Sequence, residues 1–135
     1  YLSLQVRSAQ RDAQTSNFHR VADSFNDLNR MVGADPKLAE LFNRGMVDFD
    51  SLDDTERTQL GMLFVTACRI YDSLHYQFQR EVGDPELWSA EVETLKGFCR
   101  APGFRSWWAW NTFKFSPAFT AFINSILEEQ DASAI

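Results

Sequence analysis

The sequence has few of the residues from which metal and redox sites are built. Its 135 residues include two cysteines, Cys68 and Cys99, and two histidines, His19 and His75. The cysteines lack the Cys-x-x-Cys spacing of zinc and dithiol sites, and each lies in an apolar stretch with helical periodicity. We therefore expect two buried free thiols, as in a reducing compartment, in preference to a disulfide. No cofactor is predicted.

Each histidine has a carboxylate on the same helix face, which makes a metal-dependent enzyme one hypothesis to weigh. Asp23 follows His19 by four residues, and Asp72 precedes His75 by three. Such pairs would form a site only if their helices faced each other, and the sequence has neither His-x3-His nor Glu-x-x-His. Surface or capping roles are favoured for these side chains, so no metal site is predicted.

Long apolar runs and an excess of positive charge are also missing. The longest apolar stretch, 60–65, is far shorter than the roughly 20 residues that span a bilayer. Acidic residues outnumber basic residues by 19 to 13, so nucleic-acid binding, which needs clustered positive charge, is not expected. The sequence has no Gly-x-Ser-x-Gly motif, phosphate-binding glycine loop or dinucleotide fingerprint, which makes an enzyme the less favoured class.

What the sequence does contain is apolar residues at helical spacing. Hydrophobic residues make up 44% of the chain and 12 of them are phenylalanine, enough for a core. No segment shows the sustained alternation typical of a strand. The sequence thus predicts one all-α domain, a bundle of about six helices. The predicted helices cover 2–32, 37–44, 54–82, 86–100, 104–112 and 118–129.

Capping residues and glycines mark most of these boundaries. Three N-cap residues precede a proline suited to the first helical position: Asp35-Pro36, Asp84-Pro85 and Ser116-Pro117. Asp53, with Glu56 three residues later, matches a capping box. Three glycines follow periodic stretches, and we expect each to end a helix in the left-handed conformation: Gly33, Gly45 and Gly83.

The helix predicted for 54–82 is apolar on most of its sides, so we expect it at the centre of the bundle, with Met62 widening its buried stripe. Arg69, Asp72 and Tyr76 step by three and four along the same line. Two interpretations are open. The favoured one is an internal ion pair that fixes helix register, and the other is a polar pocket for a small molecule or lipid.

Three tryptophans lie within four residues: Trp107, Trp108 and Trp110. They cannot all point the same way on a helix, so at least one should be partly exposed. We consider them as an interaction surface, for a partner protein or a membrane interface. The alternative is core packing with one incidental exposed ring, and the sequence does not decide between the two.

The first half of the first helix is mostly polar, with Val6, Ala9 and Ala13 as its few apolar residues between 5 and 17. Such a segment contributes little to a core. It would project, pair with another copy, or connect to something upstream. The sequence therefore divides into a polar helical extension (1–17), a helical bundle (18–129) and a disordered tail (130–135).

The opening heptapeptide Tyr1-Leu2-Ser3-Leu4-Gln5-Val6-Arg7 and the polar helix after it resemble the exit of a membrane anchor. The resemblance is to a family of small bacterial proteins with one N-terminal transmembrane helix and a helical domain of unassigned activity. Other matching features extend over nearly the whole chain: Asp35-Pro36-x-Leu38, Arg44-Gly45, Ser51-Leu52-Asp53, Glu86-Leu87-Trp88, Pro102-Gly103, Trp107-Trp108 and Phe115-Ser116-Pro117-x-Phe119. The resemblance implies location and layout, and the spanning helix itself is absent from this sequence.

If a spanning helix precedes Tyr1, then Arg7, Arg11 and Arg20 lie just beyond it. Their excess over acidic residues favours the cytoplasmic side of the bacterial inner membrane. We therefore expect an interaction or scaffold domain of a membrane-anchored protein, with a protein partner or with self-association through the first helix. The alternative is a bundle that binds a small molecule or lipid.

Overall fold

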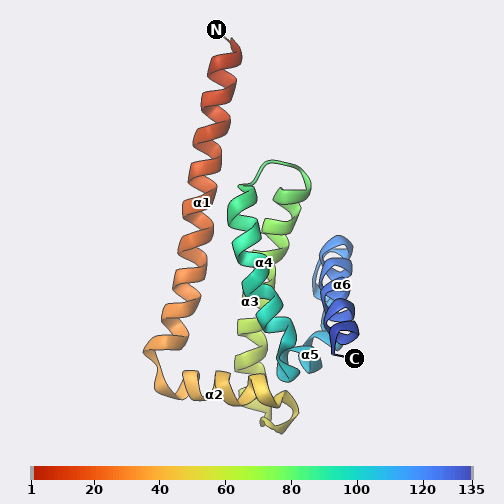
Figure 1. The fold of residues 1–135 in the computed structure, drawn as a ribbon. Coiled ribbons are helices and arrows are strands. Elements are labelled where there is room, and N and C mark those ends of the chain that lie inside the picture. The colour runs from red at the N-terminus through yellow and green to blue at the C-terminus, as the bar shows by residue number, and fades with distance from the viewer. Residues whose placement is uncertain (1, 135) are drawn as a thin grey trace.

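The computed structural model describes residues 2–134, and its secondary structure there is entirely helical (Figure 1). The six α-helices are α1 (Leu2–Ala34), α2 (Pro36–Val47), α3 (Asp54–Gln79), α4 (Pro85–Arg100), α5 (Pro102–Ala109) and α6 (Pro117–Ser133). Two short 3-10 helices, η1 (Phe49–Ser51) and η2 (Thr112–Lys114), lie in the connections. The predicted all-α class and the predicted number of helices are confirmed.

The helix starts follow the capping residues that the sequence predicts. The Asp35 side chain accepts hydrogen bonds from the backbone N–H groups of Lys37 and Leu38. Asp84 and Ser116 cap α4 and α6 in the same way. Asp53 and Glu56 form both hydrogen bonds of the predicted capping box. These starts depend on contacts within one turn, so local sequence is enough to find them.

The prediction that three glycines end helices in the left-handed conformation is wrong, although Gly83 does lie in the loop after α3. No glycine in residues 2–134 has a positive φ, and Gly33 and Gly45 lie inside α1 and α2. The residue with a positive φ is Glu81, at 58°, just past the end of α3. The last residue of α3 is Gln79, three residues before the end that the sequence predicted.

Gly103 instead allows α5 to touch the backbone of α2, and Gly45 makes room for a side chain of α3. A Cβ atom on Gly103 would lie 1.7 Å from the carbonyl oxygen of Gly45. A Cβ atom on Gly45 would lie 2.1 Å from Cδ2 of Leu60, on α3. Each glycine thus permits a close approach to a different helix, a role that only the tertiary structure reveals.

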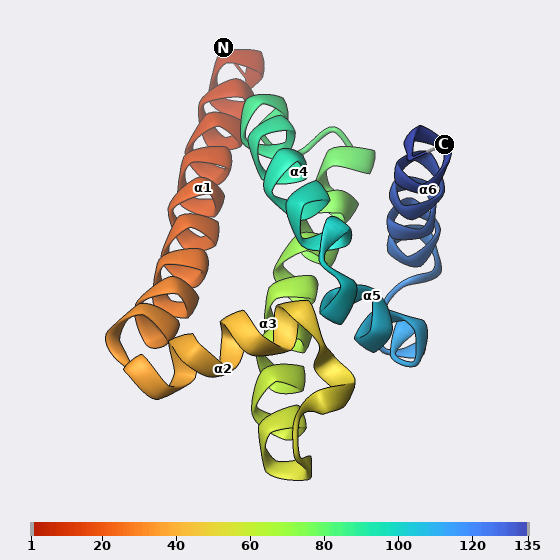
Figure 2. The same ribbon diagram turned by 60° about the horizontal axis from the view of Figure 1, so that its bottom comes forward.

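α3 lies at the centre of the bundle, as predicted, and contacts α1, α2, α4 and α6, with α2 crossing near its N-terminal end (Figure 2). Its buried residues are Leu60, Leu63, Phe64, Cys68, Tyr71, Leu74 and His75. Met62 was expected to widen this buried face, but its side chain is 64% exposed. The buried face of α3 is therefore narrower than the sequence suggests.

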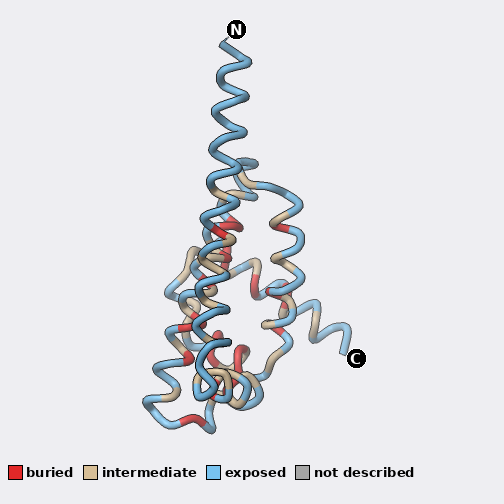
Figure 3. The backbone as a smooth tube through the Cα atoms, turned by 90° about the vertical axis from the view of Figure 1, so that its left-hand side faces the viewer, coloured by how far each residue is buried: buried red, intermediate tan, exposed pale blue. Residues whose placement is uncertain are grey.

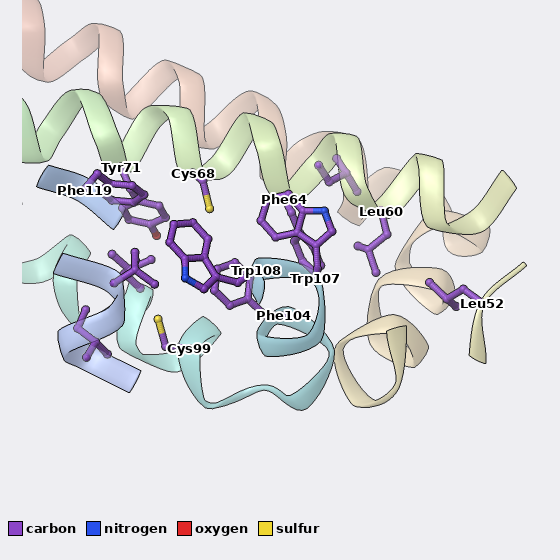
Figure 4. Packing of buried hydrophobic residues seen from close by; sticks show 14 of the residues in the cluster. Leu52, Leu60, Phe64, Cys68, Tyr71, Cys99, Phe104, Trp107, Trp108 and Phe119 are labelled. Atoms are coloured by element: carbon purple, nitrogen blue, oxygen red, sulfur yellow. The ribbon is translucent and has the colours of Figure 1, made fainter. Parts of the chain in front are cut away.

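Aromatic side chains from α5 fill the space between α3 and α6 (Figure 4). Trp108 is the largest fully buried side chain of α5. Its ring stacks on that of Phe115, with the ring centroids 5.6 Å apart. The indole N–H of Trp108 donates to the side-chain oxygen of Asn124, on α6, at 3.0 Å. The buried polar atom of the tryptophan is thereby satisfied inside an otherwise apolar core.

The tail predicted to be disordered, 130–135, is helical as far as Ser133, where α6 ends. Arg105 of α5 donates hydrogen bonds to the side chains of Asp131 (2.7 Å) and Gln130 (3.0 Å). The Gln130 amide in turn donates to the carbonyl oxygen of Lys96, on α4. These long-range bonds hold the last turns of α6 against the bundle. Residue 135 lies outside the described residues.

α1 divides into a free half and a packed half. Every residue from 2 to 16 is exposed, and this part of the helix extends past α3 and α4 (Figures 1 and 3). From Asn17 onward the helix meets the bundle, where Gln77 donates a hydrogen bond to Asn17 and Phe25 packs on Tyr71. None of the helices within residues 2–134 is both long and apolar enough to cross a membrane.

Candidate functional site

The three residues considered on α3 do not form an internal ion pair. Both carboxylate oxygens of Asp72 accept hydrogen bonds from Ser116, one from its backbone N–H at 2.9 Å and one from its hydroxyl at 2.8 Å. Asp72 therefore joins α3 to the N-cap residue of α6. Arg69 is exposed, and so is Tyr76, whose ring lies under the guanidinium of Arg80 at 4.5 Å. The predicted register-fixing ion pair is wrong: Arg69 and Tyr76 face solvent, and Asp72 between them is partly covered by the start of α6.

The three tryptophans have two different environments. Trp107 and Trp108 are buried in the core, so the prediction that they form an interaction surface is wrong. Trp110 is 83% exposed, which confirms that at least one of the rings had to face solvent. The reason is the geometry of α5: residues 103, 104, 107 and 108 face inward, whereas Trp110 is the C-cap residue that follows the last turn of the helix.

Phe113, which belongs to the same aromatic-rich stretch of sequence as the tryptophans, is 79% exposed and lies three residues from Trp110. The ammonium group of Lys114 is 5.8 Å from the centre of the Phe113 ring. The Asn111 side chain donates to the carbonyl oxygen of Trp107 at 2.7 Å, which fixes the end of α5. We call Trp110 and Phe113 the aromatic patch. Asn111, a residue that favours turns, was the available signal that α5 ends before Phe113, which lies in η2.

The two histidines lie in different surroundings. His75 is buried, and its ring stacks on Phe122 with centroids 4.9 Å apart. Burial lowers the pKa of His75, and the nearby Asp72 only partly opposes that effect. His19 is exposed on α1. Within residues 2–134, no three histidine, cysteine or carboxylate side chains gather where they could hold a metal ion.

Cys68 and Cys99 are both buried and unpaired with each other, which confirms the predicted free thiols. Burial raises the pKa of Cys68 and raises that of Cys99 to about 11. A thiol reacts as its thiolate, so both are chemically inert near neutral pH. These cysteines are therefore core residues and do not form a reactive site.

Two open grooves flank α1 where its free half leaves the bundle. One has a volume of about 330 Å³ and lies between Gln10, Ala13 and Asn17 of α1 and the loop residues Glu81 and Val82. The second, of about 510 Å³, lies between Arg11, Thr15 and His19 of α1 and residues 83–85, where the loop ends and α4 begins. The surface that is open to a partner thus continues from the free helix onto the α3–α4 loop.

A further hollow of about 480 Å³ lies between α4, α5 and the end of α6, and it contains charges of both signs. Its most enclosed cation, Arg105, is held by Asp131, Gln130 and the carbonyl oxygen of Cys99. The hydrogen bonds of this guanidinium are therefore already made within the protein, and they hold the end of α6 against α4 and α5.

No protein-family model matches the chain, and no curated protein or solved structure matches it either.

Proposed function

We propose that this chain is a protein-interaction or scaffold domain, anchored in its natural protein to the bacterial inner membrane and lying on the cytoplasmic side. One observation carries the proposal. The first 15 described residues of the 33-residue helix α1, from 2 to 16, are exposed without exception. Half of the longest helix therefore contributes nothing to the core of its own domain.

The free half of α1 has no packing support within its own domain. Isolated helices shorter than about 12–15 residues are only marginally stable in water, and most helical stability in proteins comes from packing. The free half also exposes apolar side chains, with Leu2 at 75% and Val6 at 54%. A contact that covers this segment would stabilise the helix and remove apolar surface from water.

The expected anchor is supported by the charges on the free half. Arg7 and Arg11 lie within three turns of its start, accompanied by a single acidic residue, Asp12. Positive charge next to a spanning helix favours the cytoplasmic side. The buried free thiols are consistent with a reducing compartment.

The aromatic patch gives the domain a second contact surface. In Figure 1 the N-terminus and α5 lie at opposite ends of the molecule. With the N-terminus at the membrane, Trp110 and Phe113 would face the cytoplasm, where a protein partner can reach them. Exposed tryptophan is enriched at protein interfaces, because it provides a large apolar area at low entropic cost. A domain with a contact surface at each end suits a scaffold.

Nothing in the arrangement of Arg69, Asp72 and Tyr76 favours the alternative of a small-molecule or lipid-binding bundle. Two of these side chains are exposed, and Asp72 is fully used as the link to Ser116.

A native gel of the natural full-length protein, extracted from membranes in mild detergent, tests the proposal. We expect the protein in the membrane fraction, in a complex larger than a monomer. Replacing Leu2, Leu4 and Val6 with glutamine should disperse the complex, whereas Val47→Gln, a change at an equally exposed site on α2, should leave it intact. A monomer in the soluble fraction for all forms would exclude the proposal.

A further inference from the structure

We propose that two copies of this chain pair in parallel along one face of the free half of α1. The contact is a seam of four residues: Leu2, Val6, Ala9 and Ala13. The inference rests on the proposed function, in which an anchor holds both N-termini in the same membrane. It goes further by naming the partner as a second copy and by fixing the orientation of the pair.

Leu2, Val6 and Ala9 lie on a face of α1 that the bundle does not use, and Ala13, the last seam residue, lies where the α3–α4 loop begins to border that face. With about 100° between successive residues, the four seam side chains fall within roughly 60° of one another around the helix. The face that packs on the bundle, through residues such as Val21 and Phe25, is turned from the seam by about 110°. A helix on the seam therefore lies beside the bundle, and in a parallel two-fold pair the two bundles point away from each other.

The spacing of the seam matches that of two-stranded helical packing. Its residues step by four, three and four, the spacing of the a and d positions of a heptad repeat. The larger side chains, Leu2 and Val6, come first, and Ala9 and Ala13 follow next to the bundle. The two alanines allow the helix axes to approach closely at the point where the bundles begin.

Charge favours a second copy over a charged partner. The seam is bordered by uncharged side chains: Gln5, Gln10, Ser16 and Asn17. Arg7 and Arg11 project at least about 130° away from the seam, so a parallel pair does not bring them face to face. A strongly acidic partner would instead be drawn to the arginine side of the helix.

The seam is short, and its length explains why it would act at a membrane. The next positions at this spacing are Ser16 and Arg20, of which Arg20 would oppose its own copy, and the α3–α4 loop lies beside Ala13 at Val82. The pair therefore spans about 12 residues, or about 18 Å. One helix face of this length buries less than the roughly 1,200 Å² of a stable complex. Two anchors in one bilayer would raise the effective concentration and stabilise the pair.

Cysteine cross-linking in membranes that contain the full-length protein tests both the partner and the orientation. Leu2→Cys, Ala9→Cys and Ala13→Cys, each introduced singly, should each form a disulfide-linked dimer under mild oxidation. Ser8→Cys is the matched control, because it is an exposed neighbour about 130° away from the seam centre. We expect cross-linking at least tenfold slower there. The natural cysteines do not interfere, since both are buried.

Leu2→Cys decides the orientation. In an antiparallel pair Leu2 would lie opposite Ala13 of the other copy, about 16 Å along the axis from its own counterpart. Cross-linking only in a mixture of Leu2→Cys and Ala13→Cys would overturn the parallel arrangement. Absence of cross-linking at all seam positions, with a complex still visible on the native gel, would overturn the second copy as partner while the proposed function stands. If that gel shows no complex, the proposed function fails as well.

Discussion

The two halves of α1 have one continuous helical backbone and opposite relations to the rest of the molecule. Residues 2–16 are all exposed, whereas Val21 is buried and Phe25 packs on Tyr71 of α3. Apolar residues occur in both halves. In the packed half they are large and recur on the face toward α3, whereas Leu2, Val6 and the two alanines of the free half lie on a different face. Hydrophobicity alone does not make a helix part of a core; its apolar face must point toward the other helices.

If the comparison is right, changes in the packed part should unfold the domain, and changes in the free half should alter only its contacts. The largest expected effect is that of Gly103→Ala, at the contact between α2 and α5. The new Cβ would lie 1.7 Å from a backbone oxygen of Gly45, so one helix must move. We expect a loss of about 3 kcal/mol or more in the free energy of unfolding, measured by urea denaturation.

Gly97→Ala is the matched control for that change. Gly97 is exposed in α4, and no neighbouring atom lies within 4 Å of the position that a Cβ would take there, so alanine should raise stability by up to about 1 kcal/mol. Similar losses for both variants would show that the close contact of the two helices is not the cause.

The next largest effect is expected for Asp72→Ala, which removes the link between α3 and the N-cap of α6. Both hydrogen bonds to Ser116 are lost, and its partly buried N–H is left without that acceptor. We expect a loss of about 1–2 kcal/mol in unfolding free energy. Asp27→Ala, at an exposed pair with Arg30 on α1, should cost less than about 0.5 kcal/mol. Equal effects of the two changes would contradict the linking role of Asp72.

A smaller change in the free energy of unfolding is expected when the pH is lowered, because His75 is buried in the packed part of the molecule. Burial lowers its pKa in the folded state below the unfolded value of 6.5, so the unfolded chain takes up the proton first. The stability that neutral His75 contributes is complete above about pH 6.5 and is lost as the pH falls through the folded pKa. Urea denaturation at pH 7.5 and pH 5.5 should show this slope.

The His75→Phe variant should have a flatter dependence over this range, while His19→Gln, at an exposed site, should keep the slope of the original chain. Glu91, whose pKa burial raises, is present in all three forms and so cancels in the comparison. A slope that survives His75→Phe unchanged would assign the pH dependence to other groups.

The smallest effect on stability is expected in the free half itself. Leu2→Ser with Val6→Ser removes only exposed side chains, so the unfolding free energy of the domain should change by less than about 0.5 kcal/mol. The same double change should abolish the cross-links formed by Ala9→Cys and Ala13→Cys. A large loss of stability would mean that the free half supports the bundle, and the comparison between the two halves would fail.

Much of the fold could be predicted because the signals are local. Asp35, Asp53 and Ser116 each cap a helix through bonds within three residues, and the buried stripe of α3 follows helical periodicity. The candidate site was harder to predict from the sequence. Arg69 and Tyr76 step along α3 as a buried line would, yet both face solvent, because the neighbouring helices cover a different part of its surface.

The sequence by itself determined the all-α class, the helix starts and the scarcity of apolar residues in the first half of α1. Each of these depends on residues within one or two turns of helix. Only the tertiary structure decided that Gly45 and Gly103 each permit a close contact, that Trp107 and Trp108 are core while Trp110 is surface, and that the end of α6 is held by Arg105. These outcomes depend on which distant helix comes to lie against a residue, and that information is absent from the residue's local sequence.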